Sequence, residues 1–121
     1  MIAIVATDAP LMAHQLKRLA RRVPLGLART GTVGNNSSGD IFLAFSTANE
    51  EAFAARGGLT HMAMLGNGDI DKLFMATVEA TEEAVIDAML MAETMVGRDG
   101  NTAVALPAGE LMDLMRKYQR I

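Results

Sequence analysis

Two short apolar runs constrain the fold of this chain more than any other feature of its sequence. Met1 to Ala6 and Ile41 to Phe45 are continuous stretches of aliphatic and aromatic residues, without the polar alternation of a half-exposed strand. Such runs are typical of strands that are covered on both faces. We therefore expect an α/β fold in which helices cover one face of a sheet and a second sheet covers the other.

The segment after the first run has the spacing of an amphipathic helix. Its apolar residues recur at helical intervals, and they are Met12, Leu16, Leu19 and Val23. The other side carries His14, Gln15, Lys17, Arg18, Arg21 and Arg22. Asp8 is placed to cap this helix, and Pro24 removes a backbone donor and should kink or end it.

Helical spacing also appears twice later in the chain. From Ile70 to Val96 it predicts one long helix, or two that meet near Thr81. A last helix is predicted to begin at Pro107, with four residues facing inward: Leu111, Leu114, Met115 and Tyr118. The segments between are predicted as a loop over 30–40, a connection over 50–58, a third strand over 59–65, a turn over 98–101 and a short strand over 104–106. No linker or repeat divides the 121 residues, so we expect a single domain.

Composition excludes several classes of protein. Half of the residues are hydrophobic, which argues against a disordered chain, and the absence of cysteine excludes disulfides, thiolate metal sites and a Cys nucleophile. No apolar run reaches the roughly 18 residues of a membrane span, and the first residues lack the charged start of a signal peptide. A mean hydropathy of +0.21 suggests that apolar surface meets a partner chain. The cytoplasm is the expected compartment, with the periplasm as the alternative.

The charged and metal-binding side chains give no strong signal for nucleic acid, metal or cofactor. The net charge is −3, and the one basic stretch, 17–22, is interpreted as a solvated helix face, with phosphate or nucleic-acid contact as the alternative. His14 and His61 lie far apart in the sequence, and neither has an acidic neighbour at metal-ligand spacing. We therefore expect no metal, no cofactor and no nucleic-acid partner.

The polar loop before the second apolar run is the best candidate for chemistry. Ser37, Ser38 and Asp40 stand immediately before a buried strand, which would hold their backbone in place. Asn35 and Asn36 can supply further hydrogen bonds. Because Ser and Asp before a strand are also ordinary turn chemistry, these facts alone leave a structural role and a catalytic role open.

Three segments, in this order, resemble a known family. They are Ala6 to Leu11, His14 to Arg22 and Ser38 to Asn49. The family is that of the L-aminopeptidase/D-alanine-esterases, which includes β-peptidyl aminopeptidases and nylon-oligomer hydrolases. The resemblance covers nearly the whole chain, and three long motifs at family-like spacing are far more specific than one short motif.

The resemblance implies a self-processing hydrolase. Family members are made as precursors that cleave one internal bond, and the new N-terminal Ser or Thr of the smaller subunit becomes the nucleophile, with its own α-amine as the base. The implied fold is a four-layer α/β/β/α sandwich that a larger upstream subunit completes. Carried onto this sequence, Ser38 would hydrogen-bond to the nucleophile, and Asp40 would orient Ser38 and stabilise the nearby α-ammonium.

The chain departs from the family pattern at its start, because the nucleophile should stand immediately before Met1. A thioether has no proton to give up, so Met1 cannot replace it. The chain begins one residue late, is read from an internal Met, or is a degenerate homologue. We expect residues 1–121 to be a β-subunit that is inactive alone, whose partners are the upstream α-subunit, a short peptide or amide substrate, and other αβ units of an oligomer, but no membrane. The alternative is a non-catalytic assembly module of the same fold.

Overall fold

The computed structural model describes residues 1–121, which form two compact units, 1–82 and 83–121. The first unit contains two strands, a 3-10 turn and helices, and the second begins within the longest helix. In chain order the elements are β1 (Ile2–Thr7), α1 (Ala13–Ala20), α2 (Val23–Arg29), β2 (Ile41–Ser46), α3 (Glu50–Ala54), η1 (Asn67–Asp69), α4 (Ile70–Leu90), β3 (Met95–Val96), η2 (Arg98–Gly100), β4 (Thr102–Ala103) and α5 (Ala108–Lys117).

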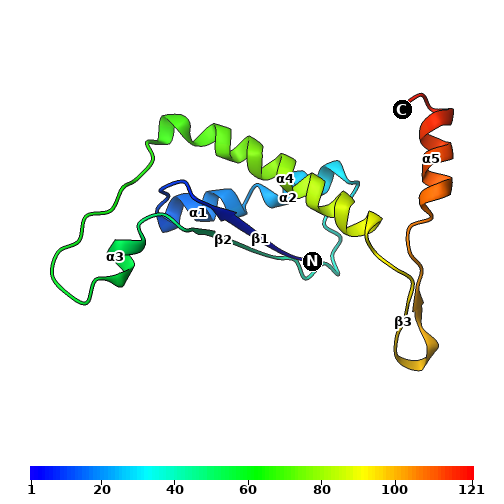
Figure 1. Ribbon diagram of the computed structural model, residues 1–121, viewed down its shortest axis with the longest axis horizontal. Coiled ribbons are helices and arrows are strands. Elements are labelled where there is room, and N and C mark those ends of the chain that lie inside the picture. The colour runs from blue at the N-terminus through cyan, green and yellow to red at the C-terminus, as the bar shows by residue number, and fades with distance from the viewer. The chain divides into compact units, whose positions relative to one another are not determined.

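The two apolar runs form a parallel pair of strands, as their composition predicts. The register runs from Ile2 opposite Ile41 to Thr7 opposite Ser46. Parallel strands need a long crossover, and α1 and α2 with the polar loop provide it (Figure 1). An α/β fold is therefore confirmed for the first unit.

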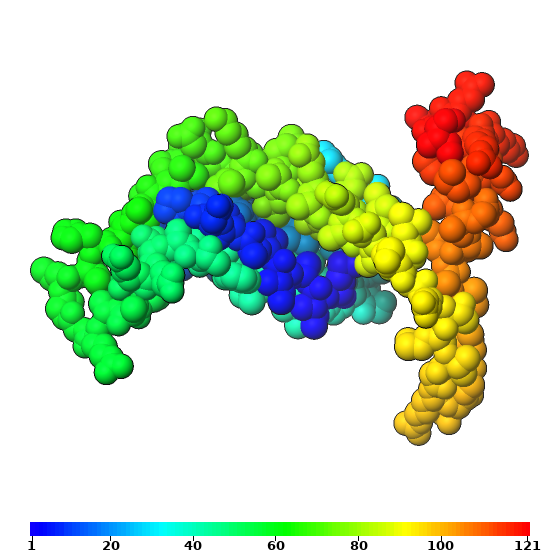
Figure 2. Space-filling model, in the orientation of Figure 1, coloured from blue at the N-terminus to red at the C-terminus, as the bar shows by residue number.

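The two faces of this sheet differ in how far the chain covers them. Val5 and Ala44 pack against a cluster of four buried residues in the first unit, Leu11, Leu19, Ile70 and Phe74. The other face is open: Ile4 keeps 62% of its surface exposed and its partner Leu43 keeps 56%. In Figure 2 the dark blue of β1 borders the blue-green of β2 at the surface. The helices of this chain cover only one face, and the second sheet predicted for the other face is not formed by residues 1–121.

Helix α1 is amphipathic, but two details differ from the sequence prediction. Gln15, placed on the polar side, is fully buried. Its side chain accepts a hydrogen bond from the Met12 main chain at 3.0 Å and donates to the Leu65 carbonyl at 2.8 Å. Gln15 therefore caps the helix start, where Asp8 was expected, and ties α1 to the chain before α4.

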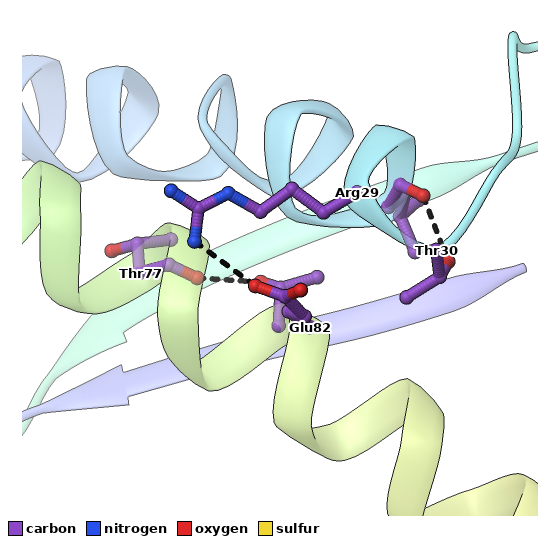
Figure 3. A network of polar contacts seen from close by, with 6 residues as sticks. Arg29, Thr30, Thr77 and Glu82 are labelled. Carbon is purple, nitrogen blue, oxygen red and sulfur yellow. Dashed lines mark hydrogen bonds and ion pairs between the residues drawn. The ribbon is translucent and has the colours of Figure 1, made fainter. Parts of the chain in front are cut away.

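Helix α2 follows after a short break, so the predicted effect of Pro24 is confirmed. Pro24 lies in the first turn of α2, where its missing N–H is harmless. Two residues later, Gly26 allows close contact with α4: a Cβ atom at this position would lie 2.5 Å from the Val78 carbonyl oxygen. Beyond this contact, Arg29 Nη1 lies 2.9 Å from Glu82 Oε2 (Figure 3). The two helices are thus joined by a close backbone approach and an ion pair.

Helix α4 is one continuous helix that ends at Leu90, short of the predicted Val96. Its buried side contains Phe74, Val78 and the two threonines Thr77 and Thr81. Each threonine hydroxyl donates at 2.7 Å to the carbonyl four residues earlier, so neither polar group is left unpaired in the packed interface. Thr81 therefore does not mark a junction between two helices.

The segment between β2 and α4 contradicts two predictions. Residues 50–54 of the expected connection form α3, and residues 59–65 form no strand, with Leu59 fully exposed. The Asn49 side chain accepts from the Ala63 nitrogen at 2.7 Å and donates to the Ala63 carbonyl at 3.1 Å. One amide thus takes up the two backbone groups that a neighbouring strand would have bound.

The second unit contains the end of α4, a short antiparallel hairpin and α5. Met95 pairs with Ala103 and Val96 with Thr102, so the predicted strand over 104–106 lies slightly earlier than expected. The turn over η2 and the helix after Pro107 are confirmed. Tyr118, predicted to face inward, is 65% exposed, and none of residues 83–121 is buried. No helix in either unit combines the length and the apolar character needed to cross a membrane.

Candidate active site

The two parallel strands begin at the same edge of the sheet, and this edge brings Met1 and Asp40 together. The Ile41 nitrogen donates to the Met1 carbonyl at 2.9 Å, which continues the strand ladder to its first residue. The Met1 nitrogen lies 2.6 Å from Asp40 Oδ1. Residues 39 positions apart in sequence thus meet through strand pairing, and the Asp40 side chain stays a quarter exposed beside them.

Ser38 completes a small polar cluster with Asp40. A hydrogen bond from the Met1 ammonium, and a second from the Ser38 hydroxyl, lower the pKa of the Asp40 carboxyl below its ordinary value. The Ser38 main chain is itself held in a turn, because its nitrogen donates to the Asn35 carbonyl at 2.8 Å. Asp40 is therefore an ionised acceptor at neutral pH, with one hydroxyl and one backbone nitrogen aimed at it.

The Ser38–Asp40 cluster can orient a hydrogen-bond donor and stabilise a positive charge, but it contains no activated nucleophile within this chain. A carboxylate held by a hydroxyl and a main-chain nitrogen can stabilise a nearby positive charge and fix the orientation of a hydrogen-bond donor. Of the sequence-predicted loop residues, Asp40 contacts Met1, and Ser38 donates to Asp40. Asn35 contributes through its main-chain carbonyl, and Asn36 and Ser37 are exposed.

A cavity opens beside Asp40, and sequence reasoning did not identify it. Its volume is about 160 Å³. The walls come from α2, from the loop that follows it and from the first position before β2, and they are Pro24, Leu27, Ala28, Thr32, Val33, Gly34 and Asp40. Apart from Asp40 and Thr32, no wall residue has a polar side chain. The separate segments carry no shared motif, so only folding reveals that they meet.

The basic stretch of α1 has a packing role in this structure. The Arg22 guanidinium lies 3.8 Å from the centroid of the Phe74 ring, and that of Arg18 lies 5.0 Å from it. Arg18 also donates to the Asn67 side chain at 3.0 Å. His14 and His61 are both exposed, and no three acidic or histidine side chains gather closely enough to hold a metal ion.

Comparison with known proteins identifies relatives along nearly the whole chain. Residues 1–103 match Peptidase family S58. The chain is 42% identical over 120 residues to a β-peptidyl aminopeptidase, BapA, of Sphingosinicella microcystinivorans. That alignment covers 99% of this chain and 30% of the relative. The chain thus spans less than a third of the length of this curated relative.

Two solved structures share the fold. One is the PH0078 protein of Pyrococcus horikoshii OT3, with a TM-score of 0.89 and 46% identity over 99% of this chain and 34% of that one. The other is the L-aminopeptidase D-Ala-esterase/amidase of Ochrobactrum anthropi, described as a variant of the Ntn hydrolase fold. Its TM-score is 0.84 with 41% identity, over 98% of this chain and 34% of that one. The resemblance predicted from three motifs is confirmed, and this chain belongs to Peptidase family S58.

Proposed function

We propose that this chain is the C-terminal β-subunit of an aminopeptidase-type amidohydrolase. The enzyme releases N-terminal residues from peptides, amides or esters through an acyl-enzyme on a Ser or Thr that immediately precedes Met1. The observation that carries the proposal is the 2.6 Å contact between the Met1 nitrogen and Asp40. A residue attached to that nitrogen places its hydroxyl and α-amine next to the Ser38–Asp40 cluster.

In this proposal each polar group has a defined role. The α-amine of the preceding residue accepts the proton of its own hydroxyl as the hydroxyl attacks the substrate carbonyl. Ser38 hydrogen-bonds to the attacking oxygen, and the ionised Asp40 stabilises the ammonium that forms. The hydrogen bond from the Ser38 hydroxyl, which does not depend on a free Met1 ammonium, lowers the pKa of Asp40 and supports a carboxylate that stays charged at neutral pH.

The missing layers of the fold come from a larger upstream subunit of the same precursor. Two observations support this part of the proposal: one face of the β1–β2 sheet is open, and residues 83–121 bury none of their side chains. A second sheet on the open face would complete the four-layer α/β/β/α sandwich, within which both units form one domain. Relatives more than three times as long as the chain agree with this arrangement.

The test is expression of the complete reading frame, including the codons upstream of Met1. We expect a precursor that cleaves itself, a smaller product whose N-terminal sequence is Ser or Thr followed by Met1 and Ile2, and release of nitroaniline from aminoacyl nitroanilides. The matched control replaces the residue before Met1 by Ala and should lose both cleavage and turnover. An assembled, folded protein without cleavage or turnover would instead favour the non-catalytic assembly module.

A further inference from the structure

We infer that the cavity beside Asp40 binds the apolar side chain of the substrate's N-terminal residue. This inference rests on the proposed function and adds the substrate class to it. The cavity and the proposed catalytic cluster share Asp40, so a group bound in the cavity lies next to the position of the acyl-enzyme.

The size and the walls of the cavity set the kind of side chain that it accepts. Its volume is about 160 Å³, and its apolar walls include Leu27, Ala28 and Val33. An apolar cavity of about 150 Å³ is large enough for a benzene ring. Side chains up to the size of leucine or phenylalanine therefore fit, whereas an acidic side chain would be repelled by the Asp40 carboxylate.

The charge of Asp40 favours the N-terminal residue over the residue on the leaving side. An aminopeptidase substrate carries a free ammonium on its N-terminal residue, and the leaving residue has none near the scissile bond. Asp40 is ionised at neutral pH because the ordinary pKa of an aspartic acid is about 3.9, and the Ser38 hydroxyl lowers the Asp40 pKa further. A carboxylate in the cavity wall thus attracts the end of the substrate that carries the ammonium.

The wall residues differ in how much a substitution would disturb the packing of the core. Leu27 is only 3% exposed, so truncating it would disturb the core. Ala28 lies on the exposed side of α2, and Val33 is 85% exposed in the loop. Enlarging either side chain narrows the cavity without opening a void in the core.

The experiment uses the complete mature protein with Ala28→Leu and, separately, Val33→Phe. Ala80→Leu is the matched control, because Ala80 is an exposed helical position in α4 that does not line the cavity. The substrates are nitroanilides of alanine and leucine, in whichever stereochemical series the wild type turns over. A second set keeps alanine first and varies the second residue. The readout is the ratio of kcat/KM for leucine to that for alanine.

We expect each narrowing variant to lower the leucine-to-alanine ratio at least about 10-fold, since one methylene in a hydrophobic pocket is worth roughly 10–200-fold. The control variant should keep the ratio, and the second-residue series should be unaffected. The inference is overturned if the ratio stays constant while turnover persists, if alanine and leucine substrates lose activity equally, or if only the second-residue series responds. A wild type with no turnover refutes the proposed function itself, and the inference with it.

Discussion

Gly26 allows a quantitative test of how α2 packs on α4. In Gly26→Ala the new Cβ atom would lie 2.5 Å from the Val78 carbonyl oxygen and 2.6 Å from the Thr81 Cβ. Carbon atoms pack best at about 3.5–4.0 Å, so the contact with the Thr81 Cβ is an overlap of about 1 Å, and the contact with the Val78 oxygen is also far shorter than an ordinary Cβ contact. The carbonyl oxygen belongs to the backbone and cannot rotate away, which means that one helix must shift.

Two opposing effects set the magnitude. Alanine in a helix is about 1 kcal/mol more favourable than glycine, and overpacking a core typically costs about 1–3 kcal/mol. With two overlaps at once, we place the overpacking at about 2–3 kcal/mol and expect a net loss of roughly 1–2 kcal/mol in the free energy of unfolding.

The assay is denaturant unfolding of the complete mature protein. The matched control is Gly109→Ala in α5, where a new Cβ atom has no neighbour within 4 Å, and it should be neutral or slightly stabilising. If Gly26→Ala is as stable as the wild type while Gly109→Ala behaves as expected, the close packing of α2 on α4 is refuted.

Four further predictions concern the site and the open sheet. In the complete protein, Asp40→Asn should lower kcat about 10²–10³-fold with an unchanged melting temperature. Ser38→Ala should remove roughly 0.5–1.5 kcal/mol of transition-state stabilisation. If the loss of activity of either variant only follows a fall in its melting temperature, the loop has a structural role. In the isolated chain, the Met1 ammonium and the Ser38 hydroxyl depress the pKa of folded Asp40, so its contribution to stability is present above about pH 4 and is lost as the pH falls through the folded pKa; an NMR titration midpoint above that pH would contradict this. The isolated chain should self-associate through the face that exposes Ile4 and Leu43, and a monodisperse monomer in sedimentation would refute that expectation.

The strands and the edge that holds the candidate site follow from local sequence. A run such as Met1 to Ala6 has few alternatives to a strand, and parallel pairing brings the residues that precede each strand together. The contact between Asp40 and the start of the chain was therefore predictable once the family resemblance had assigned catalytic roles to Asp40 and to the residue before Met1. The apolar pattern of the strands predicts that both of their faces are buried. It does not indicate whether this chain or another chain covers each face.

The details that escaped prediction depend on partners distant in sequence. Gln15 reads as a surface residue, yet it is buried because its amide finds the Leu65 carbonyl, 50 positions away. The segment 59–65 has the apolar content of a strand, but Asn49 occupies the Ala63 backbone groups that pairing requires. The cavity beside Asp40 joins segments with no common motif. In each case a tertiary contact outweighs local pattern.

The parallel pairing of β1 with β2 also has a kinetic consequence. Every rung of the ladder joins residues 39 positions apart (41 − 2 = 39), so no rung can form early by a local turn. Closing a loop of that length costs about 3 kcal/mol of chain entropy before any pairing is gained. Helices α1 and α2 lie inside the loop, and by forming first they shorten the distance that the strands must cross. We therefore expect the sheet, and with it the edge that joins Met1 to Asp40, to be among the last parts of the first unit to form.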